Sequence, residues 1–210
     1  MKAVTCRRYG SPDVLKIEEL EIPVPKANEV LVKVRATTVT SGDAKLRGFA
    51  VQLAKEMGAH VTAVCSTRNI ELVQSLGADR VIDYTVTDFT KDSSAYDVIL
   101  DTVGNTSFFE CRRVMTKHGR HVFLVHQLPQ ILQALGTALV RGKRVICGIS
   151  MSESRSDLME IKELVEAGRI RPVVDITYPL QKIIEAHQYV ETGRKRGAVV
   201  VSVNASSEAW

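Results

Sequence analysis

The residues with the chemistry to bind a ligand stand directly after apolar stretches of the chain. Arg68 follows the stretch His60 to Cys65, and Gly104 follows Asp97 to Asp101. In doubly wound folds, ligands bind outside the carboxyl ends of the strands. A guanidinium forms charge-assisted bonds to phosphate, and the end of the first stretch holds no acidic residue that would prefer a free ribose diol. These positions predict a phosphate-containing ligand; the alternatives are a solvated arginine and a simple turn glycine.

Alternating helices and short apolar strands must position these residues. From Ala50 onward we expect helices separated by the strands "HVTAVC", "RVI", "DVILD", "HVFLV" and "RVICGI". Strands without polar alternation, set between helices, are typical of a parallel sheet covered on both faces. Met1 to Val39 instead indicates an antiparallel β domain, with the strand segments "KAVTC", "VLKIEELEI" and "EVLVKVRATTV". The terminal "GAVVVSV" is predicted to be a strand that returns to this β domain.

Composition excludes several classes of protein. The chain has 210 residues, of which 45% are apolar, so it can bury a core. The net charge of +4 is mild, and basic residues are scattered among acidic ones; we therefore expect neither a nucleic-acid nor a membrane partner. No apolar run approaches the roughly 20 residues that span a bilayer, and "MKAVTCRRYG" lacks the pattern of a signal peptide. The predicted location is cytoplasmic.

The sequence predicts no metal site. Cys6, Cys65, Cys111 and Cys147 are far apart, without the spacing of zinc ligands, and four reduced thiols are expected. Histidines 118, 121 and 126 surround one predicted strand but lack an acidic or cysteine partner at ligand spacing. We interpret these histidines as incidental.

The order of the segments and their amino-acid sequences resemble the medium-chain dehydrogenase/reductase superfamily, and within it the zinc-independent quinone oxidoreductases and enone reductases. The segments that carry the resemblance are "MKAVTCRRYGSPDVLKIEELEIPVPKANEVLVKVRATTVTSGDAKLRG", "FAVQLAKEMGAHVTAVCSTRNIELVQSLGADRVIDYTVTDFT" and "GAVVVSV". It implies an α/β chain that combines a GroES-like β domain with a Rossmann-type doubly wound parallel sheet. It also implies NADPH as the hydride donor and a quinone or enone as the acceptor.

The same resemblance implies an internal deletion between "KLRG" and "FAVQLAK", where the family has its first Rossmann strand and glycine-rich turn. We expect a truncated GroES-like domain over residues 1–48, a Rossmann-like cofactor domain over 49–150, and C-terminal helices with a returning strand over 151–210. The sheet must either close over the gap or accept another strand. The segment "VLVKVRATTV" is a substitute, but Lys33 and Arg35 suit a strand with one wet face, so we expect it to stay in the β domain.

The resemblance assigns roles to individual residues. In relatives, the 2'-phosphate and adenine of NADPH lie near the positions that correspond to Thr67, Arg68 and Tyr84. Gly104 lies at the same edge of the sheet. Thr40 stands where many relatives have an asparagine near the nicotinamide, and Asp43 matches a family aspartate; these two are the candidate catalytic residues. Ala198 replaces a lysine found in many relatives. Relatives also dimerise through the strand that corresponds to Gly142 to Ile149, so a homodimer is expected.

Two functions follow. The first is an NADPH-dependent quinone or enone reductase whose activity is impaired by the deletion. The second is a non-catalytic truncated relic or splice product that acts, if at all, as a cofactor- or partner-binding module.

Overall fold

The computed structural model describes residues 1–39, 43–93, 95–139, 141–148 and 154–203, and for residues 43–47 the backbone alone. The chain divides into two compact units. The first combines Met1–Lys45 with Pro172–Trp210, and the second is Leu46–Arg171. Each unit is described separately below.

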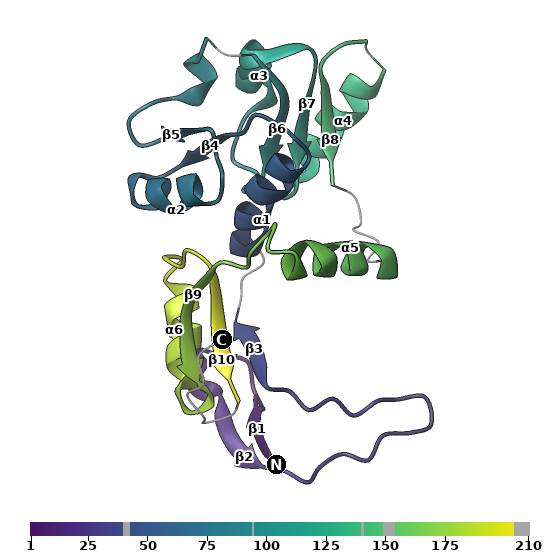
Figure 1. Ribbon diagram of the computed structural model, residues 1–210, viewed down its shortest axis with the longest axis vertical. Coiled ribbons are helices and arrows are strands. Elements are labelled where there is room, and N and C mark those ends of the chain that lie inside the picture. Colours follow the sequence, from purple (N-terminus) through teal and green to yellow (C-terminus); the bar gives the residue numbers. More distant parts are fainter. Residues whose placement is uncertain (40–42, 94, 140, 149–153, 204–210) are drawn as a thin grey trace. The chain divides into compact units, whose positions relative to one another are not determined.

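The first unit contains two small sheets. Strands β1 (Lys2–Thr5) and β2 (Lys16–Glu19) form an antiparallel pair. Strand β10 (Ala198–Ser202) lies between β3 (Ala36–Val39), to which it is antiparallel, and β9 (Val174–Pro179), to which it is parallel. Helix α6 (Ile183–Glu191) packs on this sheet (Figure 1). The core of the unit consists of Val39, Leu180, Ile183, Ala186, Val190, Val199 and Val201.

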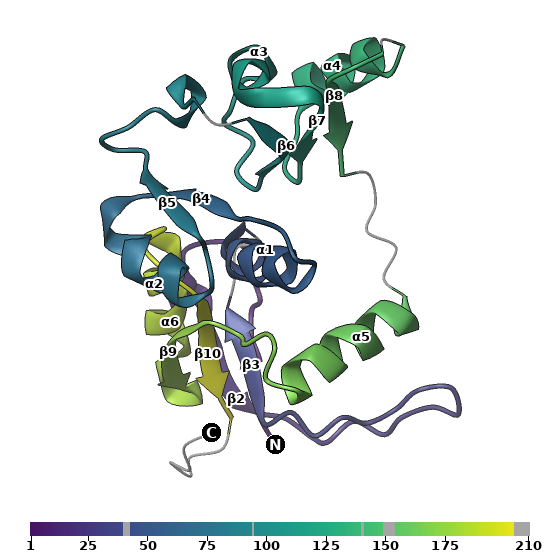
Figure 2. The ribbon, with the colours of Figure 1, turned by 45° about the horizontal axis from the view of Figure 1, so that its top comes forward.

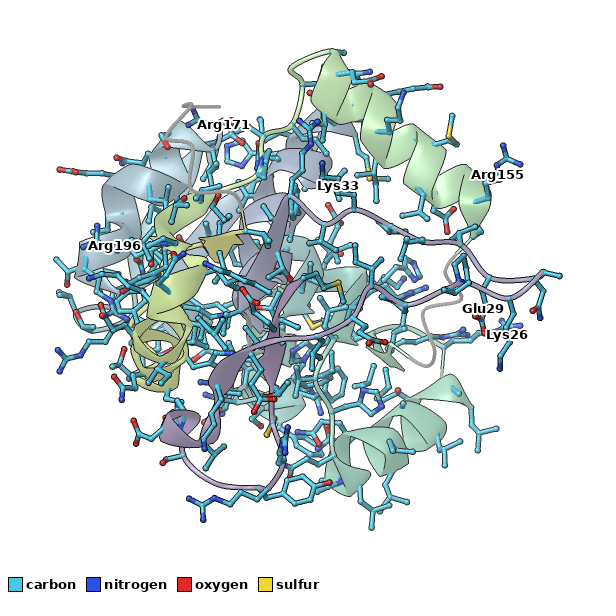
Figure 3. All side chains as sticks on the ribbon, turned by 90° about the horizontal axis from the view of Figure 1, so that it is seen from below. Lys26, Glu29, Lys33, Arg155, Arg171 and Arg196 are labelled. Atoms are coloured by element: carbon cyan, nitrogen blue, oxygen red, sulfur yellow. The ribbon has the colours of Figure 1, made fainter. Side chains whose placement is uncertain are left out.

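The last strand returns to the β domain as predicted, whereas the predicted strands "VLKIEELEI" and "EVLVKVRATTV" are longer than the observed β2 and β3. The predicted strand from Glu29 shortens to β3, and residues 20–35 form an extended arm whose turn carries Lys26 and Glu29 (Figure 3). Val24 and Val30 on this arm are 89% and 85% exposed. An extended segment becomes a strand only when a neighbour pairs with its backbone groups. Strand β9 was not predicted, because "VDITYP" is short and mixes polar residues with a proline.

The second unit alternates helices and strands. Helix α1 (Asp43–Glu56) begins earlier than the predicted Ala50 and leads to β4 (Thr62–Cys65), a short 3-10 turn at Thr67–Asn69, α2 (Ile70–Ser75) and β5 (Arg80–Asp83). The chain continues through β6 (Tyr96–Asp101), α3 (Phe108–Cys111), β7 (Met115–Phe123), α4 (Leu128–Ala138), β8 (Arg144–Cys147) and α5 (Arg155–Glu166). The core under β7 and β8 consists of Phe108, Cys111, Met115, Phe123, Val145 and Cys147.

The strands of the second unit form two parallel sheets. One pairs β4 with β5, and the other has the order β6-β7-β8 (Figure 2). The predicted parallel α/β architecture is therefore confirmed. Within the described ranges no strand joins β4 to β6, so the sheet is divided where the resemblance places the lost strand. Strand β3 does not fill the position, because it pairs with β10, as expected.

A buried glutamine joins the two ends of the second unit. The Gln52 side chain on α1 is 6% exposed; its Nε2 donates to the Arg171 carbonyl at 3.0 Å, and its Oε1 accepts from the Arg171 amide at 2.8 Å. The Arg171 guanidinium in turn donates to the Ser75 carbonyl at 3.1 Å. These bonds satisfy polar groups that would otherwise be costly to bury, and they hold α1 against the segment that follows α5.

Candidate functional site

Parallel pairing brings the predicted residues after β4 and β5 to one edge of their sheet. The register aligns Cys65 with Asp83, the last residues of the two strands. Thr67 and Arg68 lie in the 3-10 turn after β4, and Tyr84 directly follows β5. The Tyr84 amide donates to the Cys65 carbonyl at 3.1 Å, which extends the pairing by one residue. Thr67, Arg68 and Tyr84 therefore share the carboxyl edge of this sheet.

Two of these side chains are accessible to a ligand. The Tyr84 side chain is 61% exposed, and Arg68 is exposed as well. Arg68 forms no ion pair with any carboxylate in the part of the chain that the structure describes. A guanidinium and an amphipathic aromatic ring at the same edge of a sheet offer charge and a stacking face to a phosphorylated nucleoside.

Asp83 is a member of this edge that the sequence did not reveal. Its Oδ2 accepts from the Thr67 hydroxyl at 2.5 Å, and its Oδ1 accepts from the Thr85 hydroxyl at 2.7 Å and the Thr85 amide at 2.9 Å. Hydrogen bonds from Thr67 and then Thr85 lower the pKa of the Asp83 carboxyl below its usual value. The edge thus carries a negative charge next to the residue that precedes Arg68. While the Thr67 hydroxyl donates to Asp83, it cannot donate to a phosphate.

A second loop, at the carboxyl end of β6, is organised by the Asp101 carboxylate. Its Oδ1 accepts from the amides of Val103 and Gly104 at 2.8 and 2.7 Å, and its Oδ2 accepts from the Thr106 amide at 3.1 Å and the Thr106 hydroxyl at 2.5 Å. Burial by itself would raise the pKa of Asp101, but the bonds from Thr106, Gly104 and Val103 outweigh burial and lower it. Asp101 is therefore a buried anion whose partners fix the path of the loop.

Gly104 in this loop meets a strict steric requirement. Its φ is +79°, a conformation that side chains disfavour, and an added Cβ would lie 2.6 Å from the Val125 carbonyl oxygen. The turn therefore needs a glycine here, which favours the turn interpretation of this residue. A ligand role for Gly104 stays a prediction.

The buried His121 ring on β7 contacts the same loop through Thr106. The ring is fully buried, with its Nε2 3.1 Å from the Thr106 hydroxyl oxygen and its centroid 4.1 Å from that of Phe123. Because the Thr106 hydroxyl donates to Asp101, the geometry assigns the proton to His121 Nε2. Burial lowers the pKa of His121, although the Asp101 charge opposes this effect. The sequence did not predict this structural role of His121, whose interpretation as incidental concerned metal binding. The available signal was the polar loop "TVGNT" after the strand that ends at Asp101, together with a histidine on the next strand.

The candidate catalytic residues are not placed by the structure. Thr40 lies outside the described residues, and of Asp43 the structure gives the backbone at the start of α1 but not the side chain. Within the described ranges, no group of three or more histidine, cysteine or acidic side chains is arranged to hold a metal ion. All four thiols are free, and burial raises the pKa of Cys111 to about 11, which disfavours a reactive thiolate there.

Comparison with protein families identifies the lineage. The model of a family described as zinc-binding dehydrogenases matches residues 76–201. The chain belongs to this family. The zinc-binding dehydrogenases lie within the medium-chain dehydrogenase/reductase superfamily, as the sequence indicated. The donor set for zinc that the family description implies is not found among the described residues, so no step of chemistry is assigned to a metal.

Named relatives are oxidoreductases of about twice the length. The mouse mitochondrial NAD(P)H oxidoreductase RTN4IP1 is 36% identical over 176 residues, which cover 74% of this chain and 44% of the relative. The chloroplastic NADPH-dependent alkenal/one oxidoreductase of Arabidopsis thaliana is 28% identical over 198 residues, 90% of this chain and 47% of that one. The chain thus spans about half the length of the curated relatives that it matches.

Solved structures show the same fold. The quinone oxidoreductase from Coxiella burnetii superposes with a TM-score of 0.79 at 17% identity, over 97% of this chain and 99% of that chain. At this identity the likeness concerns the fold alone.

Proposed function

We propose that the chain is an NADPH-dependent oxidoreductase that reduces quinones or α,β-unsaturated carbonyl compounds, with activity impaired by the internal deletion. The observation that carries this proposal is the placement of Arg68 and Tyr84, exposed and together, at the carboxyl edge of β4 and β5. The relatives support it, because they are named as NAD(P)H, quinone and alkenal/one oxidoreductases.

Each residue has a stated part in this proposal. Arg68 binds the 2'-phosphate of the adenosine ribose, Tyr84 packs beside the adenine, and the Gly104 loop approaches the cofactor from the carboxyl end of β6. Thr40 and Asp43 remain the proposed catalytic residues on the strength of the family resemblance. When bound, NADPH supplies a hydride to the quinone, or to the β-carbon of the unsaturated carbonyl compound. We propose that no metal takes part.

The divided sheet supports impaired binding of the central part of the cofactor. A pyrophosphate is normally held by backbone amides at a strand–turn–helix junction. The strand that precedes α1 is β3, which pairs with β10 in the first unit and not with β4. Each lost charge-assisted hydrogen bond costs roughly 1.5 to 3 kcal/mol, so several would weaken affinity by orders of magnitude. The adenosine half is expected to bind better than the nicotinamide half.

Titration with NADPH and NADH, followed by cofactor fluorescence, tests the proposal. We expect saturable binding with a preference for NADPH, and loss of that preference by roughly tenfold or more in Arg68→Ala, because charge-assisted phosphate bonds are strong. Arg155→Ala is the matched control, since Arg155 is also an exposed arginine of the second unit (Figure 3). An NADPH preference that persists in Arg68→Ala would remove Arg68 from the site. No binding of either cofactor would overturn the proposed function.

The divided sheet also favours a second candidate, a non-catalytic module. In the part of the chain that the structure describes, β4 and β6 each pair with a single neighbour, and their other edges are templates for added strands. Such a module would therefore act through a partner. The two candidates differ in one measurement. Oxidation of NADPH in the presence of a quinone supports the enzyme, whereas cofactor binding without turnover supports the module.

Assembly and location are further parts of the proposal. We propose a homodimer through Gly142 to Ile149, because β8 is the outer strand of its sheet and Ile146 is 43% exposed (Figure 1); Ile149 itself lies outside the described residues. We also propose a cytoplasmic location, although the mouse and Arabidopsis relatives carry mitochondrial and chloroplastic names. Microscopy of a tagged chain in intact cells tests the location.

A further inference from the structure

A carboxylate bridges the two sheets of the second unit at their amino ends. Asp92 lies in the segment between β5 and β6, and its Oδ2 accepts from the Arg80 guanidinium at 2.5 Å and from the Tyr96 hydroxyl at 2.7 Å. Arg80 is the first residue of β5, and Tyr96 is the first residue of β6. One oxygen atom therefore links the β4–β5 sheet to the β6-β7-β8 sheet. We call this arrangement of Arg80, Asp92 and Tyr96 the Asp92 bridge.

The carboxylate of the Asp92 bridge is shielded from water. The Asp92 side chain is 10% exposed, whereas the Arg80 side chain is 45% exposed. Burial, and then the bond to Asp92, raise the pKa of Tyr96, so its hydroxyl remains protonated as a donor. Hydrogen bonds to an ionised group are stronger than neutral ones, and surroundings of low polarity strengthen them further. The bridge is therefore a firmer link than an ion pair on the open surface.

Apolar packing attaches the bridge to the second of the two sheets. Asp92 directly follows the 3-10 turn Phe89–Lys91, and its amide donates to the Phe89 carbonyl at 3.1 Å. The Phe89 side chain packs against the core under β7 and β8. Asp92 is therefore held by the β6-β7-β8 sheet, and the Arg80 guanidinium ties β5 to it.

The carboxyl ends of the two sheets lack such a link in the part of the chain that the structure describes. Asp83 bonds there to Thr67 and Thr85, and Asp101 bonds to the loop that follows it. Where both are described, no hydrogen bond or ion pair joins the loops after β4 and β5 to the loops after β6 and β7. The Asp92 bridge thus joins the sheets at one end, and the other end is free to tilt.

We propose that the Asp92 bridge positions the second unit for NADPH, because it sets the separation of the two carboxyl edges that the cofactor spans. The inference rests on the proposed function, in which Arg68 and Tyr84 bind the adenosine end at one sheet and the Gly104 loop approaches the cofactor from the other. The bridge residues lie at the opposite ends of β5 and β6, so they act through these residues and not by contact with the cofactor.

The lengths of the strands make the carboxyl edges sensitive to the bridge. Strand β5 has four residues, which corresponds to about 13 Å, so a tilt of about 5° at the bridge moves its carboxyl end by about 1 Å. A misplacement of about 1 Å far from the reacting atoms can cost about 100-fold in rate. Loss of the bridge therefore affects a ligand that contacts both edges more than a ligand that contacts one.

Titration of the full chain with two ligands separates positioning from general stability. Adenosine 2',5'-bisphosphate carries the adenine and the 2'-phosphate and contacts the β4–β5 edge alone, whereas NADPH reaches both edges. Isothermal titration calorimetry measures the two affinities. We expect loss of the bridge to weaken NADPH binding at least about fivefold, as the loss of one ordinary hydrogen bond would, and to leave binding of the bisphosphate unchanged.

Three changes to the bridge are compared. Tyr96→Phe removes one bond and keeps the ring. Asp92→Leu with Tyr96→Phe replaces both polar partners by apolar groups, which is less disruptive than leaving one of them unpaired. Arg80→Gln removes the cation from β5, and Arg80→Lys, which keeps it, is expected to recover most of the affinity for NADPH.

Two controls break comparable bonds that do not cross between the sheets. Tyr189→Phe removes the bond from the Tyr189 hydroxyl to Asp175 at 2.8 Å in the first unit. Lys55→Gln removes the ion pair with Asp79 at 2.8 Å, which joins α1 to the residue before β5. Both should bind NADPH like the wild type. Circular dichroism establishes that each variant is folded.

Different results overturn the proposed function and the role of the bridge. Wild-type chain that binds neither ligand overturns the proposed function, and the role of the bridge with it. If the wild type binds both ligands and the folded bridge variants bind NADPH equally well, only the role of the bridge is wrong. It is also wrong if both ligands weaken by the same factor, if the controls lose as much affinity for NADPH, or if the wild type binds the bisphosphate but not NADPH.

Discussion

The proposed phosphate site contains two oppositely charged residues, Arg68 and Asp83, at the carboxyl edge of β4 and β5. Asp83 bonds to Thr67, which precedes Arg68, and its hydrogen bonds keep it ionised. A phosphate attracted by Arg68 is therefore also repelled by Asp83. We expect Asp83→Asn to raise the affinity for NADPH roughly two- to fivefold, as removal of a nearby like charge in a solvated site would, with little effect on NADH. Fluorescence titration measures both.

Asp83→Glu is the control for this prediction, because it keeps the charge. If Asp83→Asn improves NADH as much as NADPH, the charge of Asp83 does not act on the 2'-phosphate.

His121 gives the stability of the second unit a pH dependence. Burial lowers its pKa in the folded chain, whereas an unfolded histidine titrates near about 6.5. Between these values the unfolded chain binds a proton that the folded chain does not, so stability is lost as the pH falls below about 6.5. We expect His121→Gln to remove this part of the pH dependence in urea titrations at several pH values. The control His118→Gln alters an exposed histidine and should keep the wild-type slope.

The Asp101 carboxylate contributes to the pH dependence of folding stability at a lower pH than His121 does. Its pKa is lowered in the folded chain, so its contribution is present above the unfolded value of about 3.9 and is lost as the pH falls below that value. The His121 and Asp101 effects therefore occupy different pH windows.

A His121→Gln variant with an unchanged slope between pH 6.5 and 5 would show that His121 is not held neutral by burial.

At the scale of elements, β8 is the strand on which the proposed dimer depends. Amides two residues apart in a strand point the same way, and the Gly148 amide donates to the Phe123 carbonyl on β7 at 2.9 Å. The Ile146 amide therefore also faces β7, and a proline at this position would break the sheet itself. The Val145 amide faces outward but already donates to Thr137, so α4 covers part of the outer edge.

A charge on the exposed side chain is the better test of this edge. We expect Ile146→Lys to convert a dimer into a monomer, because a lysine opposes edge-to-edge association and the Ile146 side chain is not part of the core. Sedimentation velocity at micromolar concentration measures the change. A wild-type chain that is already monomeric would contradict the dimer.

Elements with strong periodicity were predictable, and those that depend on partners were not. Strands β4 to β8 and helix α4 were expected because apolar runs between helices indicate parallel strands. Residues 29–35 of the arm were predicted as strand from their alternation, yet strand formation requires a neighbour that the described chain does not supply. At the candidate site, Arg68 was predicted from its place after a strand and Tyr84 from the family resemblance. Asp83 and His121 were missed, because their roles arise from register and burial.

At the scale of the whole molecule, the sequence separation between paired strands determines which unit can fold first during synthesis. Every strand pair of the second unit joins neighbours along the chain, so this unit is complete once Arg171 has been made. The sheet of the first unit pairs β3 with β10 and cannot close until Ser202 has left the ribosome. Domains that emerge first generally fold first. Strand β3 and the arm therefore have no strand partner while the second unit folds. During translation, we expect the amino-terminal segment to be the part of the chain most exposed to chaperones and proteases.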